Sequence, residues 1–269
     1  LAEWGGKLIE IPYTRDISCT TLEREYRNML NTPDNRRAKL KRMLAVKPYV
    51  TVMEASNGLT GLLVENTKVE ENEHVREFDA MWVSSLCDST FKGKPDIELV
   101  DLTSRIRTIE EIMEVTTKPI ILDGDTGGRI EHFTYNVRTL ERLGVSADII
   151  EDKTGLKQNS LFGTDAKQVL DDPYEFAKKI KAGKTAQITK DFLIFARCEA
   201  LIAGHGIEEA LNRVKIYIEV GGADGIVIHS KEKDGAEIKE FLRQFREYSK
   251  TIQVVVIPTT YNQFKDEEL

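Results

Sequence analysis

Pro119-Ile-Ile-Leu-Asp-Gly-Asp-Thr-Gly127 is a short apolar run that stops abruptly at two carboxylates. Residues 147–153, which read Ala-Asp-Ile-Ile-Glu-Asp-Lys, repeat this pattern. A short apolar run bounded by Pro or Gly predicts a buried strand of a parallel sheet. Charges at the end of such a strand are costly unless a partner compensates them.

Three carboxylates stand at these two predicted strand ends: Asp123, Asp125 and Glu151. No Cys or His lies beside them in the sequence. Hard oxygen ligands suit Mg²⁺, which keeps some of its waters and often holds a phosphate-bearing substrate. Asp is also common at strand ends as a helix N-cap. The recurrence of the pattern at two strand ends favours a metal site.

Apolar strands alternate with amphipathic helices from about residue 48 onward. This alternation predicts βαβ units and a parallel sheet, either a closed (β/α)₈ barrel or an open doubly wound sheet. The predicted strands cover residues 49–54, 80–84, 119–123, 148–151, 192–197, 225–229 and 254–258, and the predicted helices cover 108–115, 133–143, 174–182, 207–220 and 236–247.

The polar residues at the strand ends favour a TIM-type (β/α)₈ barrel. Such barrels build their sites from the ends of several strands, whereas an open sheet concentrates its site at one switch point. The sequence has no Gly-x-Gly-x-x-Gly after its first strand and no Walker-type loop. Seven strands are one too few, so we expect the chain to stop before an eighth strand and a final helix; the alternative is a strand hidden near the N-terminus. The polar strand ends are Glu54, Ser84, Asp123, Glu151, Arg197, His229 and Thr259.

Composition narrows the function classes. The chain has 269 residues, 41% of them hydrophobic, and a formal net charge of -7, which argues against a nucleic-acid-binding protein. No apolar run is long enough to cross a membrane, and Leu1-Ala-Glu-Trp-Gly-Gly6 does not begin a signal peptide. The three scattered cysteines form no metal-binding spacing, which fits a reducing cytoplasm.

The N-terminal region differs from the rest, so we divide the chain into a segment of residues 1–33 and a barrel domain of residues 34–269. A strand is predicted over 7–12, followed by a helix with Thr20 or Thr21 as N-cap. The basic cluster of residues 36–44 is interpreted as a solvated helix face beside the barrel, in preference to a nucleic-acid or membrane surface.

Further candidate site residues follow the strands. The polar loop after Glu151 carries Lys157, Asn159 and Ser160, which suit closure over an anionic substrate; an ordinary solvated loop is the alternative. Arg197 at a strand end needs an anion, which is either a ligand or Glu199. His229 is either a core residue or a ligand contact. The run Trp82-Val-Ser-Ser-Leu86 offers hydroxyls and backbone N–H groups to a carboxylate.

Taken together, these motifs resemble the phosphoenolpyruvate mutases of the isocitrate lyase superfamily, over about residues 36–269. Their order and spacing are closely similar to the family pattern. The matching segments are Met53-Glu-Ala-Ser-Asn-Gly-Leu-Thr-Gly61, Trp82-Val-Ser-Ser-Leu86, Asp123-Gly-Asp-Thr-Gly127, Glu151-Asp-Lys153, Lys157-Gln-Asn-Ser160, Ala196-Arg-Cys-Glu-Ala200 and His229-Ser-Lys231.

The resemblance implies a Mg²⁺-dependent barrel that interconverts phosphoenolpyruvate and phosphonopyruvate. It implies a small-molecule substrate, no nucleic-acid or membrane partner, and a homo-oligomer, either a dimer or a tetramer. It also implies that Asp123 binds the metal directly and that Asp125 and Glu151 bind it through water. Asp96 would take or orient the phosphoryl group, and the substrate carboxylate would be bound by Trp82, Ser84, Ser85 and Leu86. A gating loop would be formed by Lys157, Asn159 and Ser160, and the phosphoryl group would be contacted by Arg197 and His229.

The sequence departs from the family pattern at several positions. Ser85 replaces a usual Gly, which is expected to shift the N–H groups aimed at the carboxylate. Ser56 replaces a usual His, and Gly124 replaces the Ala between the paired aspartates; both exchanges are expected to be tolerated. Residues 11–21 are also similar to the tail of a glycerol-phosphate-type cytidylyltransferase, with a simple linker as the alternative.

Other functions remain open. Relatives on the same barrel are phosphonopyruvate hydrolases and carbon–carbon lyases of the isocitrate lyase type. Such lyases carry a Cys in the gating loop, and Lys157-Gln-Asn-Ser160 has none. Asn159 favours the mutase over the hydrolase. A non-catalytic truncated barrel is a third reading, and the full set of carboxylates argues against it.

Overall fold

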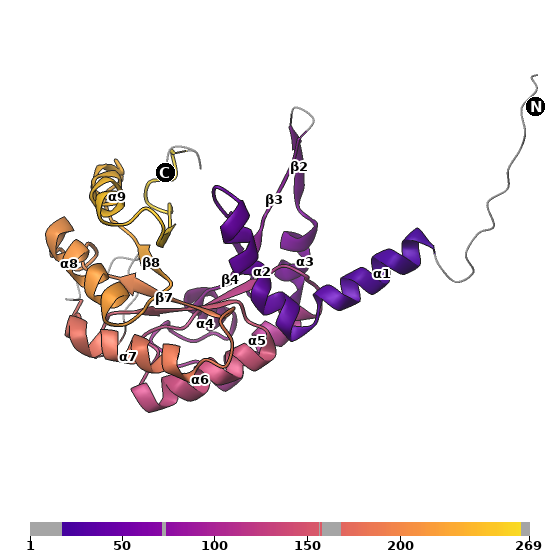
Figure 1. The fold of residues 1–269 in the computed structure, drawn as a ribbon, viewed down its shortest axis with the longest axis horizontal. Helices are drawn as coiled ribbons and strands as arrows, with labels where there is room; N and C mark the ends of the chain where they lie inside the picture. The colour runs from indigo at the N-terminus through magenta and orange to yellow at the C-terminus, as the bar shows by residue number, and fades with distance from the viewer. Residues whose placement is uncertain (1–17, 72–73, 156, 158–167, 265–269) are drawn as a thin grey trace, which may run out of the picture.

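The computed structural model describes residues 18–71, 74–155, 157 and 168–264. Seven parallel strands form one curled sheet in the order β1-β4-β5-β6-β7-β8-β9 (Figure 1). All seven were predicted from their apolar runs. Their bounds are β1 Val52–Glu54, β4 Ala80–Val83, β5 Ile120–Asp123, β6 Ala147–Glu151, β7 Leu193–Cys198, β8 Gly225–Ile228 and β9 Gln253–Val256. Within the described residues, β1 and β9 do not pair with each other.

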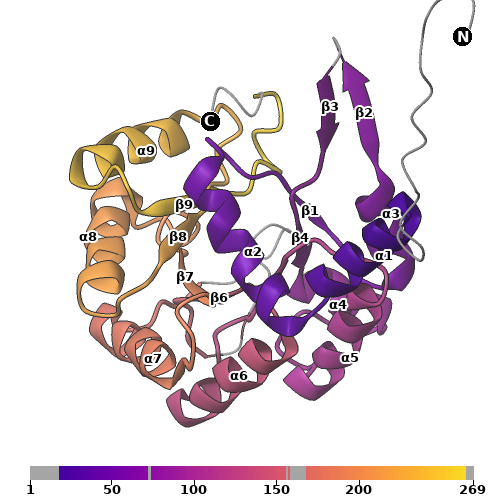
Figure 2. The same cartoon turned by 45° about the vertical axis from the view of Figure 1, so that its right-hand side comes forward.

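Helices cover the outside of the sheet, as in a TIM-type fold (Figure 2). The five predicted helices are confirmed, with earlier starts for α5 and α6. Side-chain caps set several starts: Asp101 Oδ1 accepts from the N–H of Ser104 at 3.0 Å, and Asp172 caps α7 in the same way. The helices are α1 Cys19–Leu30, α2 Pro33–Val46, α3 Gly58–Asn66, α4 Ser85–Phe91, α5 Leu102–Met113, α6 Ile130–Leu143, α7 Pro173–Ala186, α8 Gly206–Glu219 and α9 Ala236–Tyr248.

A two-stranded hairpin stands apart from the main sheet. Strands β2 (Lys68–Glu71) and β3 (His74–Glu77) pair antiparallel and project away from the barrel (Figure 1). The sequence analysis missed this hairpin because its charged composition lacks the apolar run used to find the other strands.

Helix α2 lies across the amino ends of the strands (Figure 2). Its Leu40 is 1% exposed and packs in the apolar cluster inside the sheet, against the first residues of β4, β6 and β7. The interpretation of residues 36–44 as a solvated face is therefore wrong in part. The Arg36 guanidinium donates to the carbonyl of Met113 at 3.2 Å, and that of Arg37 donates to the carbonyl of Glu141 at 2.6 Å. Both arginines are buried because they satisfy the last carbonyls of α5 and α6.

The N-cap of helix α1 precedes the predicted caps, Thr20 and Thr21, by two or three residues. The hydroxyl oxygen of Ser18 accepts from the N–H of Thr21 at 3.0 Å, so Ser18 is the capping residue and both Thr20 and Thr21 lie in the helix. The strand predicted over residues 7–12 lies outside the described residues.

Candidate active site at the carboxyl ends of the strands

The turn after β5 brings two of the predicted metal ligands together. Asp123 ends β5, and Asp125 follows with a φ of 56°, a left-handed conformation that is uncommon for a residue with a side chain. The turn is fixed to β6, because the N–H of Gly124 donates to Ile149 at 2.7 Å and the N–H of Glu151 donates to the carbonyl of Asp125 at 2.8 Å. Such strained backbone is typical of functional sites.

Asp123 is buried and its carboxylate is held from two sides. Its Oδ2 accepts from the hydroxyl of Ser85 at 3.0 Å and from the N–H of Ser85 at 3.3 Å. Burial opposes the charged form, but Lys157, Arg197 and Arg105 together lower the pKa of Asp123. The group is therefore ionised at neutral pH.

The ammonium of Lys157 lies among the carboxylates. It contacts Asp125 Oδ1, and it donates to Asp96 Oδ1 at 3.0 Å and to Ser85 Oγ at 2.7 Å. Burial opposes its charge, but Asp123, Asp125, Glu151 and Asp96 raise the pKa of Lys157 above its ordinary value. Asp96 and Asp125 thus contact this cationic group directly, and the charges of Asp123 and Glu151 also act on it.

These carboxylates are not arranged as a finished metal site. Within residues 18–71, 74–155, 157 and 168–264, no three His, Cys, Asp or Glu side chains are grouped closely enough to hold a metal ion. The side chain of Glu151 turns toward other cations, with Oε1 3.7 Å from the Lys153 ammonium and Oε2 3.6 Å from Arg197 Nε. Burial, with Glu199 nearby, raises the pKa of Glu151 to about 7.

Arg197 and Glu199 form an ion pair, which was one of the two alternatives predicted from the sequence. Arg197 Nε contacts Glu199 Oε1, and Glu199 Oε2 lies 3.2 Å from the ammonium of Lys153. Arg197 also faces Glu151, so β6 and β7 share one network of alternating charges at their ends. A positive group held in this way is suited to an anionic substrate.

His229 follows β8 and is 1% exposed. Neither ring nitrogen has a hydrogen-bond partner among the described residues. Burial and then the charge of Arg197 lower the pKa of His229 to about 4. The imidazole is therefore neutral at pH 7.

The predicted carboxylate-binding run divides into different roles. Ser84 is the N-cap of α4, accepting from the N–H of Cys87 at 3.3 Å, and Ser85 binds Asp123 through both its N–H and its hydroxyl. Trp82 lies in β4 beside the inner apolar cluster, and Leu86 lies in the first turn of α4. The predicted residues Asn159 and Ser160 lie outside the described residues.

Arg105 is a buried site residue that the sequence analysis missed. From α5, its guanidinium donates to the carbonyl of Val83 and to Asp125 Oδ2, both at 3.1 Å, and also to the carbonyl of Asp123. It thereby ties the ends of β4 and β5 to one of the predicted metal ligands. The predicted helix began at residue 108, so Arg105 fell outside it, although a charged residue on an otherwise apolar helix face was the available signal.

Acidic and basic side chains at the carboxyl ends of a curled parallel sheet define an α/β enzyme of the TIM-type class. Comparison with known families narrows this class. The family model described as phosphoenolpyruvate phosphomutase matches residues 40–269, and the chain belongs to this family. It is 38% identical to the phosphoenolpyruvate phosphomutase of Tetrahymena pyriformis, over 83% of this chain and 70% of that protein.

Solved structures agree with this assignment. The crystal structure of the phosphoenolpyruvate phosphomutase from Streptomyces platensis subsp. rosaceus is similar with a TM-score of 0.78 and 33% identity, covering 86% of this chain and 76% of that chain. A phosphonopyruvate hydrolase, solved in complex with oxalate and Mg²⁺, is similar with a TM-score of 0.74 and 32% identity, covering 87% of this chain and 75% of that chain. The predicted family and fold are confirmed.

Proposed function

We propose that this chain interconverts phosphoenolpyruvate and phosphonopyruvate with the help of Mg²⁺. The observation that carries the proposal is the Lys157 ammonium, which contacts Asp96 and Asp125 and is stabilised by the charges of Asp123 and Glu151, with Arg197 in β7 and His229 directly after β8. The relatives named phosphoenolpyruvate phosphomutase support the same reaction.

The donors at the site fit a hard divalent cation. They are carboxylate and hydroxyl oxygens, and Glu151 Oε1 is buried without a hydrogen-bond partner among the described residues. We propose that Asp123 binds Mg²⁺ directly and that Asp125 and Glu151 hold its waters, with the Lys157 ammonium leaving Asp125. When bound, Mg²⁺ would stabilise negative charge on the pyruvyl fragment.

The positive and neutral groups at the site would handle the phosphoryl group. In the reaction, the bond from phosphorus to the enol oxygen breaks and a bond from phosphorus to the terminal carbon forms, with no net change in composition. Phosphoryl transfer of this kind depends on positioning and charge neutralisation. Arg197 and Lys157 supply positive charge, and the neutral imidazole of His229 offers a hydrogen bond.

Asp96 would take or orient the phosphoryl group. Its Oδ1 is 3.0 Å from the Lys157 ammonium, so the side chain that carries this function is fixed next to a cation. Lys157, with Asn159 and Ser160, is proposed to exclude water, because water at the phosphorus would hydrolyse the substrate instead of rearranging it.

The direct test follows phosphonopyruvate and Mg²⁺ with the protein by ³¹P NMR. The mutase reaction converts the phosphonate signal to that of phosphoenolpyruvate. Inorganic phosphate together with pyruvate would instead identify a hydrolase, and an unchanged spectrum with folded protein would contradict both activities. Lys157→Ala should abolish the conversion, whereas Lys178→Ala should retain it, because Lys178 is an exposed residue of α7 paired with Glu175.

No helix in the described part of the chain is long and apolar enough to cross a membrane. We propose that the protein works in the cytoplasm as a dimer or tetramer, as the family resemblance implies. Light scattering coupled to size-exclusion chromatography measures the assembly directly, and a monomeric mass at micromolar concentration would contradict it.

A further inference from the structure

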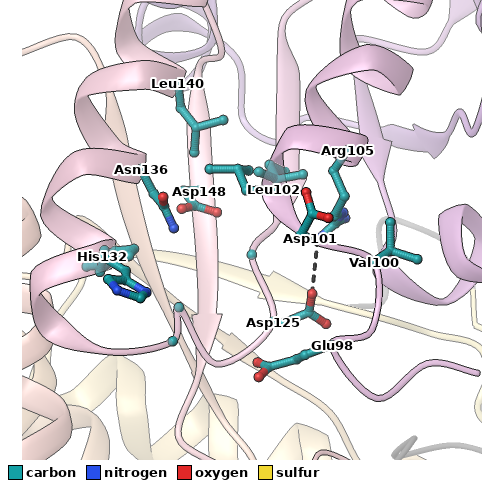
Figure 3. A pocket seen from close by; sticks show the side chains of 15 residues that line it. Glu98, Val100, Asp101, Leu102, Arg105, Asp125, His132, Asn136, Leu140 and Asp148 are labelled. Atoms are coloured by element: carbon teal, nitrogen blue, oxygen red, sulfur yellow. Dashed lines mark hydrogen bonds and ion pairs between the residues drawn. The ribbon is translucent and has the colours of Figure 1, made fainter.

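A cavity of about 260 Å³ lies outside the sheet, on the far side of the turn that carries Asp125. It is bounded by α5, by α6 and by the glycine-containing turn between β5 and α6 (Figure 3). It shares Asp125 and Arg105 with the candidate active site, but its other lining residues take no part in the function proposed above. Its volume corresponds to about eight or nine water molecules in the liquid.

Asp148, the second residue of β6, lines the inner part of this cavity. It is 2% exposed, and its Oδ1 has no hydrogen-bond partner among the described residues. Figure 3 shows its carboxyl group facing the amide of Asn136 across the cavity. Burial raises the pKa of Asp148 to about 8, although the charge of Arg105 opposes this shift. A buried polar group without a partner is rare and calls for a specific explanation.

The absence of a side chain at residue 124 makes room for this carboxyl group. A Cβ added to Gly124 would lie 2.3 Å from Asp148 Oδ1. The Asp148 carboxyl group therefore occupies the space that a side chain at residue 124 would need.

The charges around the cavity favour a cation. The carboxylates of Glu98, Asp101 and Asp125 also line the cavity. Among its described lining residues, Arg105 is the sole lysine or arginine. That guanidinium already donates to Asp123 and Asp125. The remaining wall is apolar, formed by Val100, Leu102, Leu122, Phe133 and Leu140. The cavity therefore offers acceptors at its inner end and a short apolar wall beside them.

We propose that this cavity is a second binding site, which takes a small primary ammonium compound. The ammonium would donate hydrogen bonds to Asp148 and to the amide oxygen of Asn136, and a short alkyl chain would lie against Leu102 and Leu140. A tertiary ammonium has one N–H donor and a quaternary ammonium has none, so neither can make both hydrogen bonds, and an anion would meet the carboxylates of Asp101 and Glu98. The proposal does not depend on the mutase activity.

Calorimetric titration with n-propylammonium chloride at constant ionic strength tests the site. We expect saturable binding to one site per chain with a dissociation constant in the millimolar range, the affinity of a ligand with so few atoms. Tetramethylammonium and acetate should not bind measurably. At a pH above 8, where Asp148 is ionised, Asp148→Asn should weaken propylammonium binding by about tenfold or more, because a charge-assisted hydrogen bond is lost.

A milder variant protects the test against a folding defect in Asp148→Asn. Asn136→Ala, at a half-buried position, should weaken binding about threefold to tenfold, and the matched change Asn212→Ala on the exposed face of α8 should leave it unchanged. The proposal is overturned if propylammonium binding does not saturate, because water would then be the occupant of the cavity. Equal binding of tetramethylammonium, or undiminished binding by folded Asp148→Asn or Asn136→Ala, would overturn it as well.

Discussion

Substitution of Gly124 by Ala tests the close contact between β5 and β6. The added Cβ would lie 2.3 Å from Asp148 Oδ1, 3.0 Å from its Cγ and 3.1 Å from its Oδ2, where ordinary contacts begin near 3.4 Å. The backbone of Gly124 is not left-handed, so only the crowding opposes alanine. Overpacking of a buried site costs about 1–3 kcal/mol, and the reduced entropy of the unfolded chain returns about 0.4–1 kcal/mol.

The net expectation is that Gly124→Ala lowers the unfolding free energy by roughly 0.5–2 kcal/mol. In an Asp148→Ala background the crowding is gone, so the same change should stabilise the protein by about 0.4–1 kcal/mol. The two positions are therefore expected to couple by about 1–3 kcal/mol.

Urea unfolding of the four proteins in this cycle, at one pH and temperature, measures the coupling. An Asp148→Asn background is the matched control, because asparagine keeps the shape of the side chain and cannot ionise. The cost of Gly124→Ala should persist there. The reasoning is refuted if alanine is harmless in the wild type, or if its cost is the same with Asp148→Ala as without it.

Three further predictions concern single residues. Folding raises the pKa of Asp148 from 3.8 to about 8, so the wild type should lose stability relative to Asp148→Asn as pH rises from 4 to 8. The loss should reach about 1.4 kcal/mol per pH unit and is measured by chemical unfolding across that range. A parallel pH dependence of the two proteins would contradict this prediction. Arg105→Met should lower the free energy of unfolding by about 3–5 kcal/mol in the same assay, because buried carboxylates lose their counterion. The control Arg243→Met, on the surface, should change the unfolding free energy little. Equal effects of the two substitutions would contradict this prediction. Asp96→Ala should abolish turnover and leave the melting temperature nearly unchanged, and retained turnover would remove Asp96 from the mechanism.

The sequence predicts the framework of the fold because its strands are local features. Each of the seven parallel strands is a short apolar run, and residues such as Asp123 mark where a run stops. The hairpin of β2 and β3 has no such run. The burial of Arg36 and Arg37 was missed because a basic cluster reads as solvated, and only the folded chain brings helix carbonyls to those side chains.

The candidate site was predictable in its residues and much less so in its contacts. The carboxylates of Asp123, Asp125 and Glu151 stand at strand ends in the sequence. Which cation each of them meets depends on segments far apart in the chain, so neither the central position of Lys157 nor the role of Arg105 follows from local patterns. Residue 124 shows the same limit, because its neighbour Asp148 is brought to it only by strand pairing.

Calorimetric titration of the protein with Mg²⁺ tests the central claim that the carboxylates after β5 and β6 form a divalent-cation site. The account predicts one Mg²⁺ per chain for the wild type and for Asp34→Asn, whose carboxylate lies on the surface at the start of α2. Asp123→Asn should lose this binding while remaining folded. Stoichiometric Mg²⁺ binding that survives Asp123→Asn, or a wild type that binds no Mg²⁺, would contradict the account.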